Sequence, residues 1–79
     1  MSKDPEQSIL LKFGQQIRAL RQRKAISQEE LAARAGVHRT YIGMIERGEK
    51  NVTILTMVKM ASALSVNVME LLKDFDNGK

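Results

Sequence analysis

The sequence of 79 residues contains no cysteine, a single histidine and no long apolar run, and each absence excludes a class of protein. Without cysteine there are neither disulfides nor thiolate metal sites, and His38 alone cannot assemble a metal centre. No apolar segment approaches the roughly 20 residues that a membrane-spanning helix needs. The N-terminal sequence MSKDPEQS also lacks the apolar core of a signal peptide. We therefore expect a cytoplasmic protein with no metal, no cofactor and no membrane segment.

The length of the chain limits the stability that one copy can reach. A domain of this size buries only about 60% of the surface that its unfolded chain exposes. Small domains are usually reinforced by disulfides, by a metal or by a partner subunit, and the first two are excluded here. We therefore expect one domain over residues 1–79, with an ordered core of about 5–75, that is reinforced by self-association.

Acidic residues are scarce in the middle of the chain, although the net charge of the whole chain is only +4. Residues 12–50 contain nine lysines and arginines against four glutamates, which gives this stretch a charge of +5. The simpler interpretation is a solvated basic surface. A polyanionic partner is favoured only if these bases share one face of the folded protein.

The spacing of the apolar residues predicts an all-α fold of five helices, because these residues recur at helical intervals and strict alternation is absent. Asp4 and Pro5 are typical of the cap and the first position of a helix. Ser27 opens a capping box in which the Glu30 side chain would bond back to it, and Thr53 is the expected cap of the fourth helix. The predicted helices run from residue 5 to about 24, from 28 to before Gly36, from His38 or Arg39 to Arg47, from 54 to before a break at residues 66–67, and from 68 to about 75.

Residues 28–47 have the residue types of a helix-turn-helix, in which two short helices cross steeply through a tight turn. Ala32 is small where the two helices approach each other, and Gly36 can adopt the left-handed backbone conformation of the turn. The apolar residues expected to anchor the turn and the second helix are Val37, Ile42 and Ile45. Each residue is commonplace alone, but together at these spacings they predict the motif.

The second helix of this motif has an outward side whose chemistry suits a DNA groove. At about 100° per residue, the outward residues are Arg39, Thr40, Gly43, Met44 and Arg47. Arginine can bond bidentately to guanine O6 and N7, and Thr40 and Met44 can contact thymine methyl groups. Gly43 weakens a helix by roughly 1 kcal/mol relative to alanine, so it either lets the backbone sit deep in a groove or is a tolerated surface glycine. Tyr41, at the edge, either contacts DNA or packs against the preceding helix.

The stretch ISQEELAARAGVHRTYIGMIERGEK resembles the Cro/C1-type (Xre-like) helix-turn-helix family, and the resemblance extends over about residues 10–72. The block HRTYIGMIERGEKNVT is similar to the controller proteins of restriction-modification systems. Such proteins are small dimers that bind palindromic operators and control their own promoter and the restriction gene. The resemblance implies a bacterial or phage-encoded, nucleoid-associated homodimer that binds an inverted-repeat operator in double-stranded DNA. One departure is Ala25, where the family usually has glycine.

The resemblance also implies roles for individual residues. The positions that match base-reading residues are Arg39, Thr40, Tyr41 and Met44, although some relatives have a polar side chain at the last of them. The positions that match phosphate contacts are Gln28, Arg47, Lys50 and Asn51. Arg21 and Glu46 match a structural salt bridge between the first and third helices. His38, at the start of the third helix, is interpreted as a cap or a further phosphate contact.

The C-terminal part of the chain contains the residues expected to form a dimer interface. Leu55 lies on the otherwise polar side of the fourth helix, so it is either a tolerated exposed leucine or part of that interface. The full set of candidates is Leu55, Val66, Val68, Met69, Leu72 and Phe75. Met57, Met60 and Met69 are expected to fill the core. A dimer would place its two recognition helices about 34 Å apart, in successive major grooves.

Two other functions are weighed against this interpretation. An antitoxin-type protein-binding module usually needs an additional tail or domain to hold its toxin, and few residues follow the fifth predicted helix. An enzyme is disfavoured because we find no nucleophile beside a base, no phosphate loop and no metal cluster, so no catalytic residue is expected. Besides pairing with Arg21, Glu46 could in principle contact RNA polymerase.

Overall fold

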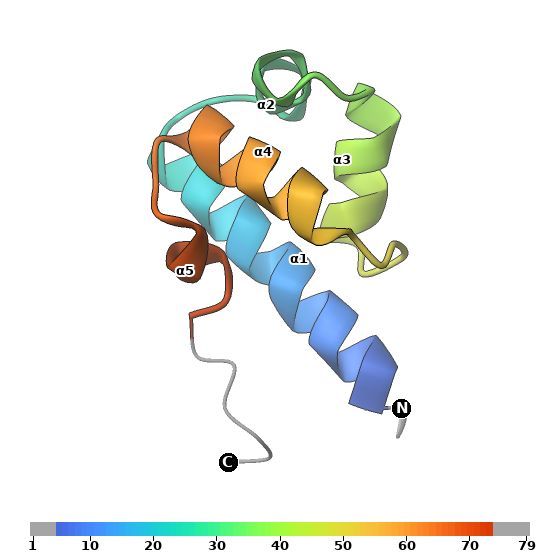
Figure 1. Cartoon of the computed structure of the whole chain (residues 1–79). Helices are drawn as coiled ribbons and strands as arrows, with labels where there is room; N and C mark the ends of the chain where they lie inside the picture. The colour runs from blue at the N-terminus through green and yellow to red at the C-terminus, as the bar shows by residue number, and fades with distance from the viewer. Residues whose placement is uncertain (1–4, 74–79) are drawn as a thin grey trace.

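The five predicted helices are present in the computed structural model, which describes residues 5–73 (Figure 1). Their bounds are α1 Pro5–Arg23, α2 Gln28–Ala35, α3 Arg39–Glu46, α4 Ile54–Leu64 and α5 Val68–Leu71. Helix α2 packs against α3 and α4, while α1 packs against α3 and α5. The expectation of an all-α five-helix fold is confirmed. No helix within residues 5–73 combines the length and the apolar character that crossing a membrane requires.

The helix ends are determined mainly by neighbouring polar side chains. The Ser27 hydroxyl accepts a hydrogen bond from the Glu30 backbone N–H at 3.0 Å, and the Thr53 hydroxyl accepts one from the Thr56 backbone N–H at 3.1 Å. The expected return bond from the Glu30 side chain is replaced by an ion pair. Its carboxylate accepts from Arg34 one turn later in α2, at 3.1 Å, because i,i+4 partners face each other on a helix.

Ala25 occupies the turn after α1 in a left-handed backbone conformation, with φ of 60°. Its N–H donates to the Gln22 carbonyl at 3.0 Å, and the Ile26 N–H donates to the Arg21 carbonyl at 3.2 Å. These bonds close the end of the helix in the way that glycine usually allows. The chain therefore keeps the left-handed turn although it lacks the glycine that favours it.

Helix α5 is shorter than predicted. It ends at Leu71, and Leu72 is its C-cap with φ of −110°, so the expected continuation stops before residue 73; Phe75 lies outside the described residues. Leu71 is fully buried and anchors the single turn to the core. Met69, expected to fill the core, is instead 70% exposed, because a one-turn helix can bury only one side.

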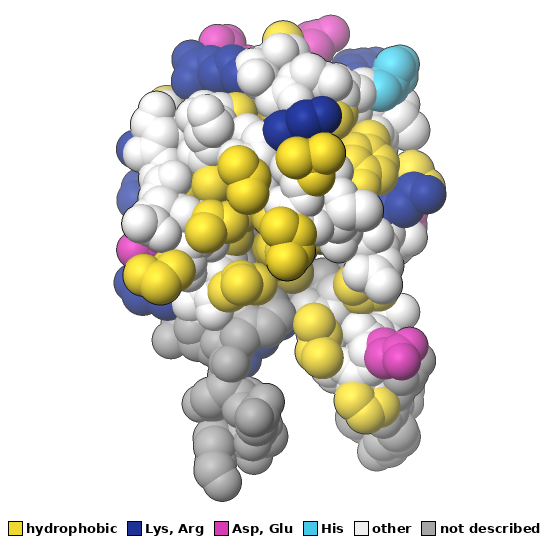
Figure 2. Space-filling view, in the orientation of Figure 1, with side chains coloured by type: hydrophobic (Ala, Val, Ile, Leu, Met, Phe, Trp, Pro, Cys, Tyr) yellow, Lys and Arg dark blue, Asp and Glu magenta, His cyan; other side chains and the backbone are white. Residues whose placement is uncertain are grey.

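Apolar side chains gather on the face formed by α4 and α5, while most lysines and arginines lie toward its edges (Figure 2). The exposed apolar residues of these two helices and of the cap of α5 are Ile54, Leu55, Val58, Met69 and Leu72. We refer to these five residues as the α4–α5 apolar surface. Monomeric soluble proteins seldom expose a large contiguous apolar patch without a binding role.

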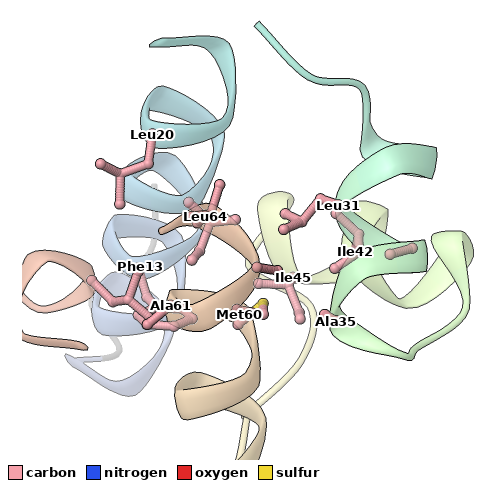
Figure 3. Close-up of a cluster of buried hydrophobic side chains, with 13 residues drawn as sticks. Phe13, Leu20, Leu31, Ala35, Ile42, Ile45, Met60, Ala61 and Leu64 are labelled. Atoms are coloured by element: carbon pink, nitrogen blue, oxygen red, sulfur yellow. The ribbon is translucent and has the colours of Figure 1, made fainter. Parts of the chain in front are cut away.

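The hydrophobic core lies between the helices and receives side chains from all five (Figure 3). Its buried residues are Phe13, Ile17, Leu20, Leu31, Ala32, Ala35, Ile42, Ile45, Met60, Ala61, Ala63, Leu64 and Leu71. Burying one of the larger aliphatic side chains stabilises the fold by about 1.5–3 kcal/mol. Ile42 and Ile45 fix the inner side of α3 in this core, as the sequence predicted.

Helices α1 and α3 cross with their backbones in direct contact at Gly14. A Cβ atom at this position would overlap the Ile45 carbonyl oxygen and lie 2.8 Å from the carbonyl oxygen of Glu46. Only glycine permits so close an approach. The crossing therefore fixes the end of α3 against the longest helix of the domain.

Candidate nucleic-acid interface

The turn between α2 and α3 is held by backbone hydrogen bonds and by one side chain. Gly36 has φ of +74°, and the Val37 N–H donates to the Ala32 carbonyl at 3.0 Å. His38 Nδ1 then accepts a hydrogen bond from the Thr40 backbone N–H at 3.0 Å. Of the two roles considered for His38, the structure contains the helix cap. The turn thereby orients α3 across α2, the arrangement of a helix-turn-helix.

Helix α3 has a buried side and an exposed side. Ile42 and Ile45 are buried in the core, whereas Arg39 and Thr40 are exposed. The Arg39 guanidinium makes no hydrogen bond or ion pair with any side chain among residues 5–73. An arginine held on a rigid helix without an internal partner is available to an external acceptor.

Two residues at the edges of the exposed side are partly covered. Tyr41 is half-buried and packs against the hydrophobic core, so packing is at least part of its role. Met44 is also half-buried. Both keep an accessible portion, and neither is enclosed as the anchoring residues of α3 are.

Gly43 departs from the prediction that it lies on the open outward arc. It is buried, because the side chains of Arg47 and Gln28 cover it. A Cβ atom at Gly43 would lie 3.2 Å from Arg47 Nη1 and 3.8 Å from Gln28 Oε1. Helical angles alone could not predict this cover, because Gln28 belongs to a different helix.

Arg21, Gln28 and Glu46 form a hydrogen-bonded network that joins the first three helices. Arg21 Nε donates to Glu46 Oε2 at 2.7 Å, and Gln28 Nε2 donates to Glu46 Oε1 at 3.0 Å. Arg21 Nη1 also donates to the Ile26 carbonyl at 3.0 Å. The hydrogen bond to Glu46 raises the pKa of the Arg21 guanidinium above its usual value. The salt bridge implied by the resemblance is thus present, with side-chain exposures of 13% for Arg21 and 3% for Glu46.

The burial of Glu46 has two consequences. Removal of Arg21 would leave an uncompensated buried carboxylate, which typically costs about 3–5 kcal/mol of stability. In addition, a side chain with 3% exposure offers no surface to a second protein. The burial of Glu46 therefore favours its structural role over a contact with RNA polymerase.

The loop after α3 presents the other expected phosphate contacts. Arg47 is exposed, and its Nε and Nη2 atoms donate to the two Glu49 carboxylate oxygens at 3.0 and 3.2 Å. The hydrogen bonds to Glu49 raise the pKa of the Arg47 guanidinium. Lys50 and Asn51 follow and are both exposed. The pairing of Glu49 with Arg47 could not be predicted from the sequence, because residues two apart in a loop have no fixed relative orientation.

The interface candidates at the C-terminal end divide into two groups. Leu55, Met69 and Leu72 are exposed members of the α4–α5 apolar surface, whereas Val66 and Val68 are half-buried and pack against the core. Two further members of this surface, Ile54 with 73% exposure and Val58 with 49% exposure, were not among the predicted interface residues. They share helical spacing with the core residues of α4, which gives no signal of exposure.

A model of a family described as helix-turn-helix matches residues 17–71 of the chain. The matched residues extend from the middle of α1 to the end of α5, and so include the turn, α3 and the whole Arg21–Glu46 network. The chain belongs to the helix-turn-helix family.

Relatives of this helix-turn-helix protein include control proteins. It is 47% identical over 60 residues to control protein C.SmaI of Serratia marcescens, covering 76% of this chain and 71% of the relative. It is 46% identical to control protein C.BamHI of Bacillus amyloliquefaciens, covering 82% of each chain. The crystal structure of the restriction-modification controller protein C.AhdI from Aeromonas hydrophila matches with a TM-score of 0.80 and 45% identity, covering 81% of this chain and 97% of that one.

These findings confirm the assignment to the Cro/C1-type helix-turn-helix family and, within it, to the restriction-modification controller proteins. The chain is a transcriptional regulator and not an enzyme.

Proposed function

We propose that this helix-turn-helix regulator binds an inverted-repeat operator in double-stranded DNA as a homodimer, and controls its own promoter and the restriction gene. The observation that carries the proposal is the division of α3. Its inner side is fixed in the core, and Arg39 and Thr40 project from its exposed side. Side chains on a rigid helix can read base edges in the major groove, because the groove is wide enough to admit an α-helix.

Within this proposal, contacts divide into those that choose a sequence and those that grip the backbone. Arg39, Thr40, Tyr41 and Met44 contact base edges. Gln28, His38, Arg47, Lys50 and Asn51 contact phosphates, and these contacts make the affinity salt-dependent. The Gln28 amide uses one of its two N–H groups for Glu46, so the other remains available to a phosphate.

The α4–α5 apolar surface supports the homodimer. A second copy of the chain would cover these five apolar side chains and add buried area to a small domain. A two-fold dimer also matches an operator with two-fold sequence symmetry. Any contact with RNA polymerase would use a surface other than Glu46.

The experiment that tests this function is selection of bound duplexes from a random-sequence library at near-physiological salt, followed by sequencing. We expect an inverted repeat whose half-site centres lie about one helical turn apart. The half-site should then be found upstream of the gene for this protein. Recovery of no motif, with binding that disappears as salt increases, would contradict the proposal and favour a protein-binding module such as an antitoxin.

A further inference from the structure

The Arg47 guanidinium lies close to α3, beside Gly43. Arg47 Nη1 is 3.2 Å from the point that a Cβ atom at Gly43 would occupy, and Arg47 Cζ is 4.0 Å from it. The two residues are one helical turn apart, so the side chain folds back along the helix. An alanine at position 43 would displace the guanidinium by a few tenths of an ångström from this position.

Glu49 holds the same guanidinium from its other side. The carboxylate accepts from Nε and Nη2, at 3.0 and 3.2 Å. A guanidinium has five N–H groups in a fixed planar fork. Glu49 uses the Nε–Nη2 edge, so the Nη1–Nη2 edge is left for another bidentate acceptor, and Arg–phosphate pairs commonly have this bidentate geometry.

The Gln28 side chain approaches the same glycine from α2. Gln28 Oε1 is 3.8 Å from the same point at Gly43 that Arg47 Nη1 approaches. The Gln28 amide is itself held, because its Nε2 donates to Glu46 at 3.0 Å and Glu46 is held by Arg21. Two side chains that carry N–H donors, one from α2 and one from the end of α3, therefore both approach Gly43, and each is hydrogen-bonded to a separate carboxylate.

We propose that Gly43 and Glu49 are positioning residues, which place the Arg47 guanidinium beside the Gln28 amide so that both side chains contact one DNA phosphate. The inference rests on the proposed DNA-binding function. Gly43 provides the space and Glu49 provides the orientation, so that Arg47 is ordered before DNA arrives. Ordering a long side chain only on binding lowers the affinity by about two- to tenfold, and this is the loss that the arrangement avoids.

The test measures the affinity for a random-sequence duplex at low salt, since a phosphate contact does not depend on base sequence. The variants are Gly43→Ala and Glu49→Gln, each made with Arg47 present and with Arg47→Gln. With Arg47 present, we expect each variant to weaken binding by about two- to tenfold. In the Arg47→Gln background, we expect neither variant to weaken binding further.

Two features separate this inference from simpler explanations. Glu49→Gln removes a negative charge, so general electrostatics predicts tighter binding where we predict weaker binding. The matched control is Glu30→Gln. It removes the carboxylate of a second exposed ion pair, Arg34–Glu30 in α2, and should not weaken binding. Gly43→Ala should raise the melting temperature, because alanine favours the helix, so its weaker binding cannot be attributed to unfolding.

The inference is overturned if Glu49→Gln binds as tightly as the unmodified chain or more tightly. It is also overturned if Gly43→Ala weakens binding equally with and without Arg47, which would mean that this glycine acts by direct approach to DNA. Failure of the proposed function would be seen separately, because the unmodified chain would then select no sequence from a random library.

Discussion

Ala25 has a backbone conformation that alanine seldom adopts, with φ of 60°. The left-handed region costs an L-residue roughly 1–2 kcal/mol, whereas glycine enters it freely but loses more backbone entropy on folding. We expect Ala25→Gly to raise the free energy of unfolding by about 0.5–1 kcal/mol, measured by urea denaturation. The control is Ala33→Gly at an exposed position in α2, which should lower stability by about 1 kcal/mol. A less stable Ala25→Gly variant would contradict the assignment of strain to this turn.

Replacement of Arg39 should reduce sequence-specific DNA binding, whereas replacement of Lys50 should reduce binding to any sequence. Arg39 is exposed on α3, where we propose that it reads base edges, whereas Lys50 lies in the loop beyond this helix. We expect Arg39→Ala to lose about 1–3 kcal/mol of operator binding and to relax the base preference at one position. Lys50→Ala should weaken operator and random duplexes equally and reduce the salt dependence. Equal losses on both duplexes for Arg39→Ala would exclude its assignment to base readout.

At the scale of helices, the two glycines inside α1 and α3 should respond oppositely to substitution by alanine. Gly14→Ala would force apart the backbones of α1 and α3, and overpacking of this kind typically costs about 1–3 kcal/mol. Gly43→Ala meets only the end of a flexible arginine side chain and should stabilise α3 by up to about 1 kcal/mol. Thermal unfolding of the two variants compares them directly. If both variants change the melting temperature equally, the crossing of α1 and α3 accommodates a Cβ atom at Gly14 more easily than its close contacts indicate.

The helix ends that could be predicted from sequence are those determined by local contacts. Ser27, Gly36 and Thr53 act within a few residues of their own position, so the sequence alone contains the necessary information. The inner side of α3 was predictable for the same reason, since the spacing of Ile42 and Ile45 is a property of one helix. The base-reading candidates Arg39 and Thr40 follow from that spacing.

The features that could not be predicted depend on contacts between segments. The burial of Gly43 requires Gln28 from another helix, and the orientation of Arg47 requires a loop conformation that brings Glu49 to it. The early end of α5 depends on where Leu71 reaches the core. Ile54 and Val58 are spaced like the core residues of α4, yet they are exposed, because the spacing within one helix does not tell how far the neighbouring helices extend.

At the scale of the whole molecule, self-association should be visible in the thermal stability. If the folded chain dimerises through the α4–α5 apolar surface, its melting temperature rises with protein concentration. We expect Leu55→Glu to weaken the dimer by about 100-fold or more, because it would bury an unpaired charge. Sedimentation equilibrium measures the dissociation constant, and the melting temperature of this variant should no longer depend on concentration.

The control for the dimer experiment is Ala19→Glu, which introduces the same charge at an exposed position on α1. It should leave the dissociation constant unchanged. A Leu55→Glu variant that associates as strongly as the unmodified chain would place the dimer contact elsewhere on the molecule.

The separation of α3 into an anchored side and a projecting side also bears on how such regulators diversify. Ile42, Ile45 and Glu46 hold the helix, whereas residues 39 and 40 contribute nothing to the core. Under the proposed function, substitutions at the projecting positions change the preferred target while the scaffold stays intact. A duplicated gene could acquire a new operator through a few such changes, and an engineer could transplant the outer residues of one regulator onto another without redesigning its fold.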